Sequence, residues 1–170
     1  MKKLLLFVFL IIVSFSGLLL GWKKNSGDII LAETYQGTSK NLKDWLPLEE
    51  LYSYAEKAFR DSISATLPYE VNRIDIRKEK GTVKFTFKNN FQGIQLDGAT
   101  GKVLFIETRR SDFIEKIHDG SIVDYYLGIS IGSFKLIYTT VLGSALLLFS
   151  VTGFWLWYGP KKLRSSKRKI

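Results

Sequence analysis

The sequence contains no cysteine, one histidine and three prolines. Without cysteine there is no disulfide, no thiol nucleophile and no cysteine-ligated metal, so the folded core must depend on ordinary packing. With His118 as the one imidazole, no serine or threonine has an evident activating base. Residues 98–102 (GATGK) contain glycine, threonine and lysine, but not at the spacing of a phosphate-binding loop. We therefore expect a protein that is not an enzyme.

Acidic residues are scarce relative to basic ones, 16 against 25, which gives a formal net charge of +9. Residues 25–134 nevertheless hold all 16 acidic residues and 14 of the basic ones. The positive excess therefore lies at the two ends of the chain, and the near-neutral middle argues against nucleic-acid binding. Six of the terminal basic residues fall within residues 161–169, directly after an apolar run. Such an excess is typical of a cytoplasmic tail.

Two runs lack charge altogether: residues 4–20 and the longer residues 136–158. At about 1.5 Å per residue, the second is long enough to cross a hydrocarbon core of about 30 Å. We predict membrane helices at 1–22 and 133–159 and a basic cytoplasmic tail at 160–170. The first run also resembles a secretory signal, but it ends in LLLGWKK rather than in a small-residue cleavage pattern, which favours an uncleaved anchor. With two spans, both termini are expected in the cytoplasm and the middle segment outside, although Lys23 and Lys24 argue mildly against this orientation.

The middle segment divides by composition into a linker at 23–43 and a small α+β module at 44–110. The linker is rich in turn-forming residues and is expected to lie along the membrane or to add an edge strand. In the module, Pro47 suits the first position of a helix whose apolar stripe runs from Leu48 to Ile63.

Four alternating runs then predict strands of an antiparallel sheet with three or four members, packed on the helix by one face and open on its polar face. The residues expected to share the apolar face are Ile74, Ile76, Val83, Phe85, Phe87, Ile94, Leu96, Val103 and Phe105. Lys80-Gly81, Asn89-Asn90 and residues 97–101 are the expected turns. Thr86 is expected to point outward from the sheet, where a proline would block pairing with a partner strand.

Residues 111–132 are predicted to form a juxtamembrane amphipathic helix, capped by Ser111 or Asp112 and lying on the membrane surface. It carries His118. Asp112, Glu115 and Asp119 recur there at helical spacing, which is more typical of a solvated acidic face than of a metal site. In the membrane runs, Gly17 and Gly21 form a GxxxG step, and Gly143 and Gly153 supply further small residues, so close packing of the two helices is expected.

Several strings resemble one known family. GIQLDGATGKVL is similar to the terminal hairpin of PepSY domains, and FIEKIHDG followed by GFWLWYGPKK resembles the PepSY-associated transmembrane family of bacteria. LLLGWKKNSG and WLPLEELYSYAEKA occur in the matching order, so the resemblance covers nearly the whole chain. It implies a protein of the bacterial inner or plasma membrane with a PepSY-like module outside. PepSY modules are thought to act as inhibitory or protein-binding modules, and larger relatives are linked to iron and siderophore uptake or are haem-containing reductases.

We therefore expect a binding or regulatory module that contacts the lipid bilayer and an envelope protein such as a peptidase or a transport subunit. In the turn, Asp97, Thr100 and Gly101 are the candidate partner contacts, a role that rests on the resemblance. The alternative is a small redox subunit for iron uptake that binds haem b through His118. Because such sites usually use two histidines, that alternative would require a homodimer. Otherwise His118 is structural or interfacial, or senses pH.

Overall fold

The computed structural model describes residues 2–88, 90–129 and 131–167, and the side chains of residues 2, 3, 5, 6 and 161–167 lie outside that description. Asn89 of one predicted turn and the last three residues of the predicted tail also lie outside it. The chain divides into two compact units, residues 18–114 and residues 1–17 with 115–170. Each unit is described by itself.

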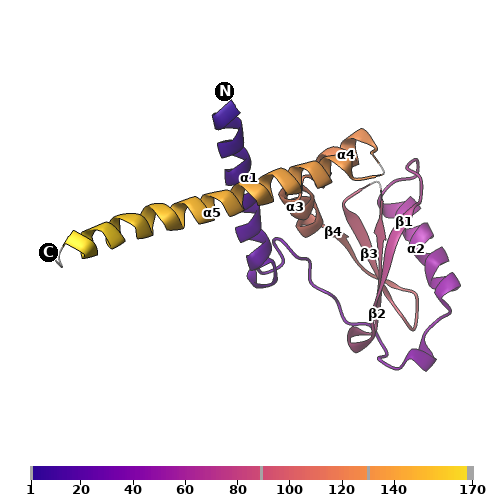
Figure 1. The fold of residues 1–170 in the computed structure, drawn as a ribbon. Coiled ribbons are helices and arrows are strands. Elements are labelled where there is room, and N and C mark those ends of the chain that lie inside the picture. The colour runs from indigo at the N-terminus through magenta and orange to yellow at the C-terminus, as the bar shows by residue number, and fades with distance from the viewer. Residues whose placement is uncertain (1, 89, 130, 168–170) are drawn as a thin grey trace. The chain divides into compact units, whose positions relative to one another are not determined.

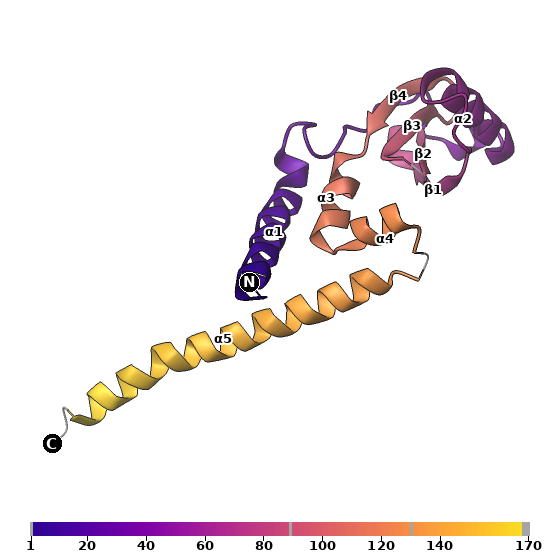
Figure 2. The same ribbon diagram turned by 90° about the horizontal axis from the view of Figure 1, so that it is seen from above.

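In the unit of residues 18–114, one helix covers one face of an antiparallel sheet (Figures 1 and 2). The helix is α2 (Leu48–Ser62), and the strands are β1 (Val71–Arg77), β2 (Thr82–Phe87), β3 (Gln92–Asp97) and β4 (Val103–Thr108). Their spatial order follows the sequence, β1-β2-β3-β4, so β1 and β4 form the edges. The predicted α+β class is confirmed, and the antiparallel sheet, expected to have three or four strands, has four. Pro47 is the N-cap of α2 rather than its first helical residue.

The core lies between α2 and the sheet, as the apolar periodicities predict. It consists of Leu51, Ala55, Ala58, Phe59, Val83, Phe85, Phe87, Ile94 and Leu96. Phe59 and Phe87 pack edge to face with ring centroids 4.6 Å apart. Burying one such side chain contributes roughly 1.5–3 kcal/mol, so this layer is the main source of stability in the unit.

Strand β4 departs from simple alternation. Val103 pairs with Leu96 and Phe105 pairs with Gln95, with a bulge between the two pairs. Because directly opposed residues share a face, the bulge places Val103 and Phe105 on opposite faces of the sheet. The prediction that they share the apolar face is therefore wrong. Ile106 takes the place opposite Ile94 and packs against the core.

The second face of the sheet is covered over β2 and β3, so the prediction of an open polar face is wrong there. Thr82, Thr86 and Gln95 are fully buried there. Residues 33–38, which we call the strap, provide part of the cover: the backbone N–H of Tyr35 donates to Gln95 Oε1 at 3.0 Å, and Thr82 Oγ1 donates to the Tyr35 carbonyl at 2.7 Å. The predicted linker is thus partly a component of the module.

The other unit contains the long apolar helices. Helix α1 (Lys2–Trp22) begins in this unit, and α5 (Ser133–Lys167) runs through Pro160 into the predicted tail. Two stretches in the described part of the chain are long and apolar enough to cross a membrane, Phe7–Asn25 and Ser133–Pro160. The segment predicted as one amphipathic helix is two helices, α3 (Arg110–His118) and α4 (Ser121–Leu127), separated at Gly120. Ser111 and Asp112 lie inside the first turn of α3 and are not its cap.

Candidate functional site

A small polar pocket opens on the second face of the sheet, beside the strap-covered area. It is about 70 Å³ in volume. Side chains of β2 and β4 form its floor, and side chains of β1 and of the first turn of α3 form its walls. Its charged lining residues are Arg73, Asp75, Arg77, Lys84, Glu107, Arg109 and Asp112. Cross-strand pairing of Arg73 with Thr86 and of Asp75 with Lys84 explains why these side chains share one face.

The floor of this pocket is a buried ion pair. Lys84 Nζ lies 2.8 Å from Glu107 Oε2, and the two side chains are 9% and 4% exposed. Gln95 Nε2 also donates to Glu107 Oε2 at 2.8 Å and to the carbonyl of Glu33. The charges therefore satisfy each other, as burial of an ion pair requires. Sequence alternation placed Lys84 on the polar face but gave no sign of its burial.

The rim of the pocket is different, because two arginines share one carboxylate. Arg73 Nε lies 2.9 Å from Asp75 Oδ1, whereas an Arg77 terminal nitrogen lies 4.0 Å from Asp75 Oδ2. Both arginine side chains are more than half exposed. A guanidinium carries five N–H donors, so this rim keeps donors available to an incoming oxygen. Chemically, the pocket suits recognition of an anion.

Strand β1 carries that rim along an edge of the sheet. Among the residues that the structure describes, it pairs with β2 alone, and four of its seven residues are exposed. Thr86, by contrast, lies in the interior strand β2 between Arg73 and Gly93 and is fully buried. The expectation that Thr86 points outward is wrong, and a proline there would break the sheet instead of blocking its edge.

The predicted contact residues Asp97, Thr100 and Gly101 lie together in the turn between β3 and β4. Asp97 is buried, and its carboxylate accepts the backbone N–H and the hydroxyl of Thr38 and the backbone N–H of Ala99. Burial by itself would raise the pKa of Asp97, but these hydrogen bonds outweigh it and lower the pKa below its ordinary value. Asp97 thus fastens the strap to the turn.

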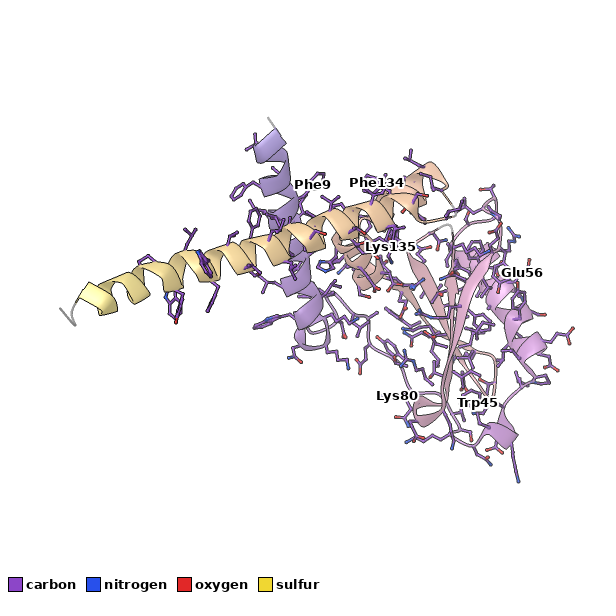
Figure 3. All side chains as sticks on the ribbon, viewed as in Figure 1. Phe9, Trp45, Glu56, Lys80, Phe134 and Lys135 are labelled. Atoms are coloured by element: carbon purple, nitrogen blue, oxygen red, sulfur yellow. The ribbon has the colours of Figure 1, made fainter. Side chains whose placement is uncertain are left out.

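The other two turn residues differ in exposure. Thr100 is exposed, while Gly101 has a φ of 69° and packs against the ring of Tyr54. A Cβ on Gly101 would lie 2.5 Å from that ring, so the turn requires glycine there. The same end of the sheet carries Trp45, whose indole N–H donates to the Ser39 carbonyl, and Lys80 (Figure 3). The role of the turn as a partner contact stays a prediction, and Thr100 is its accessible member.

His118 lies at the end of α3 and contacts α1. Its Nδ1 is 3.0 Å from Ser16 Oγ, while that hydroxyl lies 2.6 Å from the Ile12 carbonyl. Ser16 and His118 Nδ1 therefore share a hydrogen bond whose donor is set by the tautomer of the imidazole. The imidazole edge also rests on Gly17, where a Cβ would come within 3.3 Å of Cε1. Sequence reasoning identified His118 and Gly17 separately but had no signal that they meet.

A haem centre fits these residues poorly. The hydrogen bond to Ser16 engages Nδ1 and does not exclude an axial bond from Nε2, but the chain has no second histidine, and Cε1, which adjoins Nε2, is packed against α1. Among the described residues no group of three or more His, Asp and Glu side chains could hold a metal ion. Asp112 pairs with Arg109 and Asp119 with Lys135, so two of the three acidic residues at helical spacing are engaged by cations.

Two aspartates organise the start of α5: Asp119, one of the acidic residues at helical spacing, and Asp124, which sequence reasoning did not single out. Asp124 is buried and accepts the backbone N–H groups of Phe134 and Lys135 at 3.0 and 2.9 Å. Asp119 lies 2.5 Å from the Lys135 ammonium and accepts the Ser121 N–H. Burial would raise the pKa of Asp119, but the hydrogen bonds from Lys135 and Ser121 outweigh it and lower the pKa. We call this arrangement the elbow; Figure 3 marks Phe134 and Lys135 at its α5 side.

An α+β module joined to two long apolar helices is consistent with a two-pass membrane protein. The chain belongs to the family described as PepSY-associated TM region, whose profile matches residues 4–170. The resemblance noted in the sequence is therefore confirmed over nearly the full length. No curated protein and no solved structure matches the chain.

Proposed function

We propose that this chain is a membrane-anchored binding module that holds a partner protein beside the bilayer through edge strand β1. The observation that carries the proposal is the outer side of β1, whose one strand neighbour in the described part of the chain is β2. An edge strand can bind an extended segment by backbone hydrogen bonds while its side chains select the sequence. The proposal is for binding without catalysis, and Lys84 and Glu107 support it because these two buried side chains are engaged with each other in an ion pair.

Strand β1 is preferred to the other edge, β4. Four of the six β4 residues are half-buried or buried. Directly after the strand, α3 begins, and the backbone N–H of Ser111 donates to the Ile30 carbonyl at 2.9 Å. The chain therefore already occupies the neighbourhood of that edge.

The proposed setting is a bacterial inner or plasma membrane with both termini in the cytoplasm and the module outside. The support is the excess of six basic residues within residues 161–169, because such segments are retained on the cytoplasmic side. A reporter that is active only in the cytoplasm should work after Ile170 and be silent when inserted beside Asn90. Activity at Asn90 and silence after Ile170 would reverse the orientation.

Photo-crosslinking tests the binding edge directly. The photoreactive residue benzoylphenylalanine replaces Ile76, a β1 residue that is 58% exposed. The full chain is expressed in cells of the organism that encodes it. The control carries the same group at the exposed Lys57 on α2, on the opposite side of the core. We expect irradiation to give one adduct at Ile76, identified by mass spectrometry as a single envelope protein, and none at Lys57. No adduct at Ile76, or equal adducts at both positions, would overturn the proposal.

A further inference from the structure

The rim of the β1 pocket has more positive than negative charge to offer a partner. Four cationic side chains line the pocket against three carboxylates, an excess of one positive charge. The buried pair of Lys84 and Glu107 is closed at the floor. The excess positive charge therefore lies at the rim, where Arg73 and Arg77 share the carboxylate of Asp75.

The size of the pocket limits what can enter. Its volume of about 70 Å³ is about half of the roughly 150 Å³ cavity that holds benzene in an engineered protein core. A carboxylate group fits such a space, whereas an aromatic ring or a nucleotide does not. Arginine guanidinium groups bind carboxylates through paired N–H donors, so the chemistry of the rim agrees with this size limit.

The pocket also continues into the unpaired edge of β1. Arg73, Asp75 and Arg77 project on one face at alternate positions, so the two arginines are about 13 Å apart along the strand. Charged side chains along an edge strand disfavour pairing with uncharged or basic strands. An added strand with acidic residues opposite the arginines would instead gain cross-strand ion pairs.

We propose that β1 selects an acidic, extended polypeptide segment. One carboxylate of that segment enters the pocket beside Arg73 and Arg77, and this inference rests on the proposed function. Arg73 is held by its 2.9 Å contact with Asp75, while Arg77, at 4.0 Å, is the looser of the two and turns to the incoming carboxylate. The partner's backbone pairs with β1, and its charge sets the specificity. Edge pairing alone would accept many sequences, so the arginines supply the discrimination.

A peptide titration of the full chain in nanodiscs of zwitterionic phosphatidylcholine tests this. The probe is a fluorescein-labelled, end-capped dodecapeptide of alternating Glu and Thr, and the comparison peptide has Gln in place of Glu. Measured by fluorescence anisotropy, the Glu peptide should bind at least tenfold more tightly than the Gln peptide. Because the unaltered chain is used, this comparison does not depend on how a variant folds. Equal binding of both peptides would overturn the selection of acidic segments.

The paired variant Arg73→Gln with Arg77→Gln should weaken binding of the Glu peptide at least tenfold. The matched control, Lys57→Gln with Arg60→Gln on α2, removes the same charge and should stay within twofold of the unaltered chain. An equal loss in both would show attraction by overall charge and overturn the site. Displacement of the peptide by sodium acetate at an equal concentration would overturn polypeptide docking and indicate a site for small carboxylates.

The crosslinking experiment separates the two proposals. If the Ile76 adduct forms but is unchanged by the Arg73 and Arg77 substitutions, the charge selection fails while the binding edge stands. If the Ile76 adduct does not form at all, the proposed function fails as well.

Discussion

The carboxylate of Asp124 accepts the backbone N–H of Lys135 at 2.9 Å, across eleven residues of sequence. The same carboxylate accepts the N–H of Phe134, so one α4 side chain caps the first turn of α5. Because a carboxylate at a helix N-terminus also interacts favourably with the helix dipole, the contact fixes where the second apolar helix begins.

Replacing Asp124 with alanine should free these two N–H groups. We expect hydrogen exchange at Phe134 and Lys135 to accelerate by about tenfold, corresponding to a loss of about 1–2 kcal/mol. Glu115→Ala, which removes an exposed carboxylate from α3, is the matched control and should leave exchange there unchanged. Equal protection in Asp124→Ala and the unaltered chain would contradict the capping role.

The two glycines of the GxxxG step should respond differently to enlargement. A Cβ at Gly17 would lie 3.3 Å from His118 Cε1, whereas one at Gly21 has nothing within 4 Å. Gly17→Val should therefore displace the imidazole and lose its hydrogen bond to Ser16, measured as a changed ¹⁵N shift of His118 Nδ1, while Gly21→Val should leave that signal in place. A signal unmoved by Gly17→Val would show that this contact is not formed.

Breaking the buried ion pair should cost far more than replacing it whole. Lys84→Met leaves Glu107 charged and buried without its cation, and we expect a loss of about 3–5 kcal/mol in the free energy of unfolding. Adding Glu107→Gln removes the orphaned charge while keeping an acceptor for Gln95, and should restore most of that loss. Urea denaturation followed by tryptophan fluorescence measures both, and a double variant as unstable as the single one would refute the pairing.

Acid should loosen the strap through Asp97. Because hydrogen bonds lower the folded-state pKa of Asp97, its stabilising contribution is fully present above the unfolded pKa of about 3.9 and is lost as the pH falls through the lower folded value. In Asp97→Asn this part of the pH dependence should disappear. Hydrogen exchange at Thr38, whose backbone N–H bonds Asp97, reports it between about pH 5 and pH 2; identical acid curves for both proteins would contradict the tie.

The haem alternative is decided by an absorption spectrum of the detergent-purified protein from haem-replete cells, oxidised and then reduced. Because one chain offers one imidazole, and Ser16 and Gly17 hold it against α1, we expect no Soret band. A Soret band that disappears in His118→Ala would make the protein a haem subunit instead.

The sequence predicted the core well because that core obeys simple periodicities. Leu51, Ala55 and Phe59 recur at helical spacing, and Val83, Phe85 and Phe87 alternate, so each pattern alone identified the buried face. Two of the predictions were wrong because one residue interrupts a pattern. The β4 bulge exchanged the faces of Val103 and Phe105, and Gly120, with a φ of 78°, ended the helix that was expected to continue.

The candidate site was less predictable because its contacts are non-local. Tyr35 meets Gln95 across 60 residues, and Ser16 meets His118 across 102, with no periodic signal in the intervening chain. The charged residues of β1, Arg73, Asp75 and Arg77, occur at alternate positions in the sequence, although the prediction did not use them. Their position on an edge strand, however, follows from the order in which the strands pair, and the sequence left that order open.

The strap changes where the module can be cut. A fragment starting at residue 44, the boundary that composition suggests, would omit Tyr35 and Thr38, so Gln95 would lose the N–H of Tyr35 and Asp97 would lose the N–H of Thr38. Without the strap, the polar groups of this sheet face lack their hydrogen-bond partners and can pair with strands of other molecules. We therefore expect that fragment to be less stable and to aggregate. The smallest autonomous version of the module therefore begins before the strap, close to Ile30, whose side chain is buried and whose carbonyl holds Ser111.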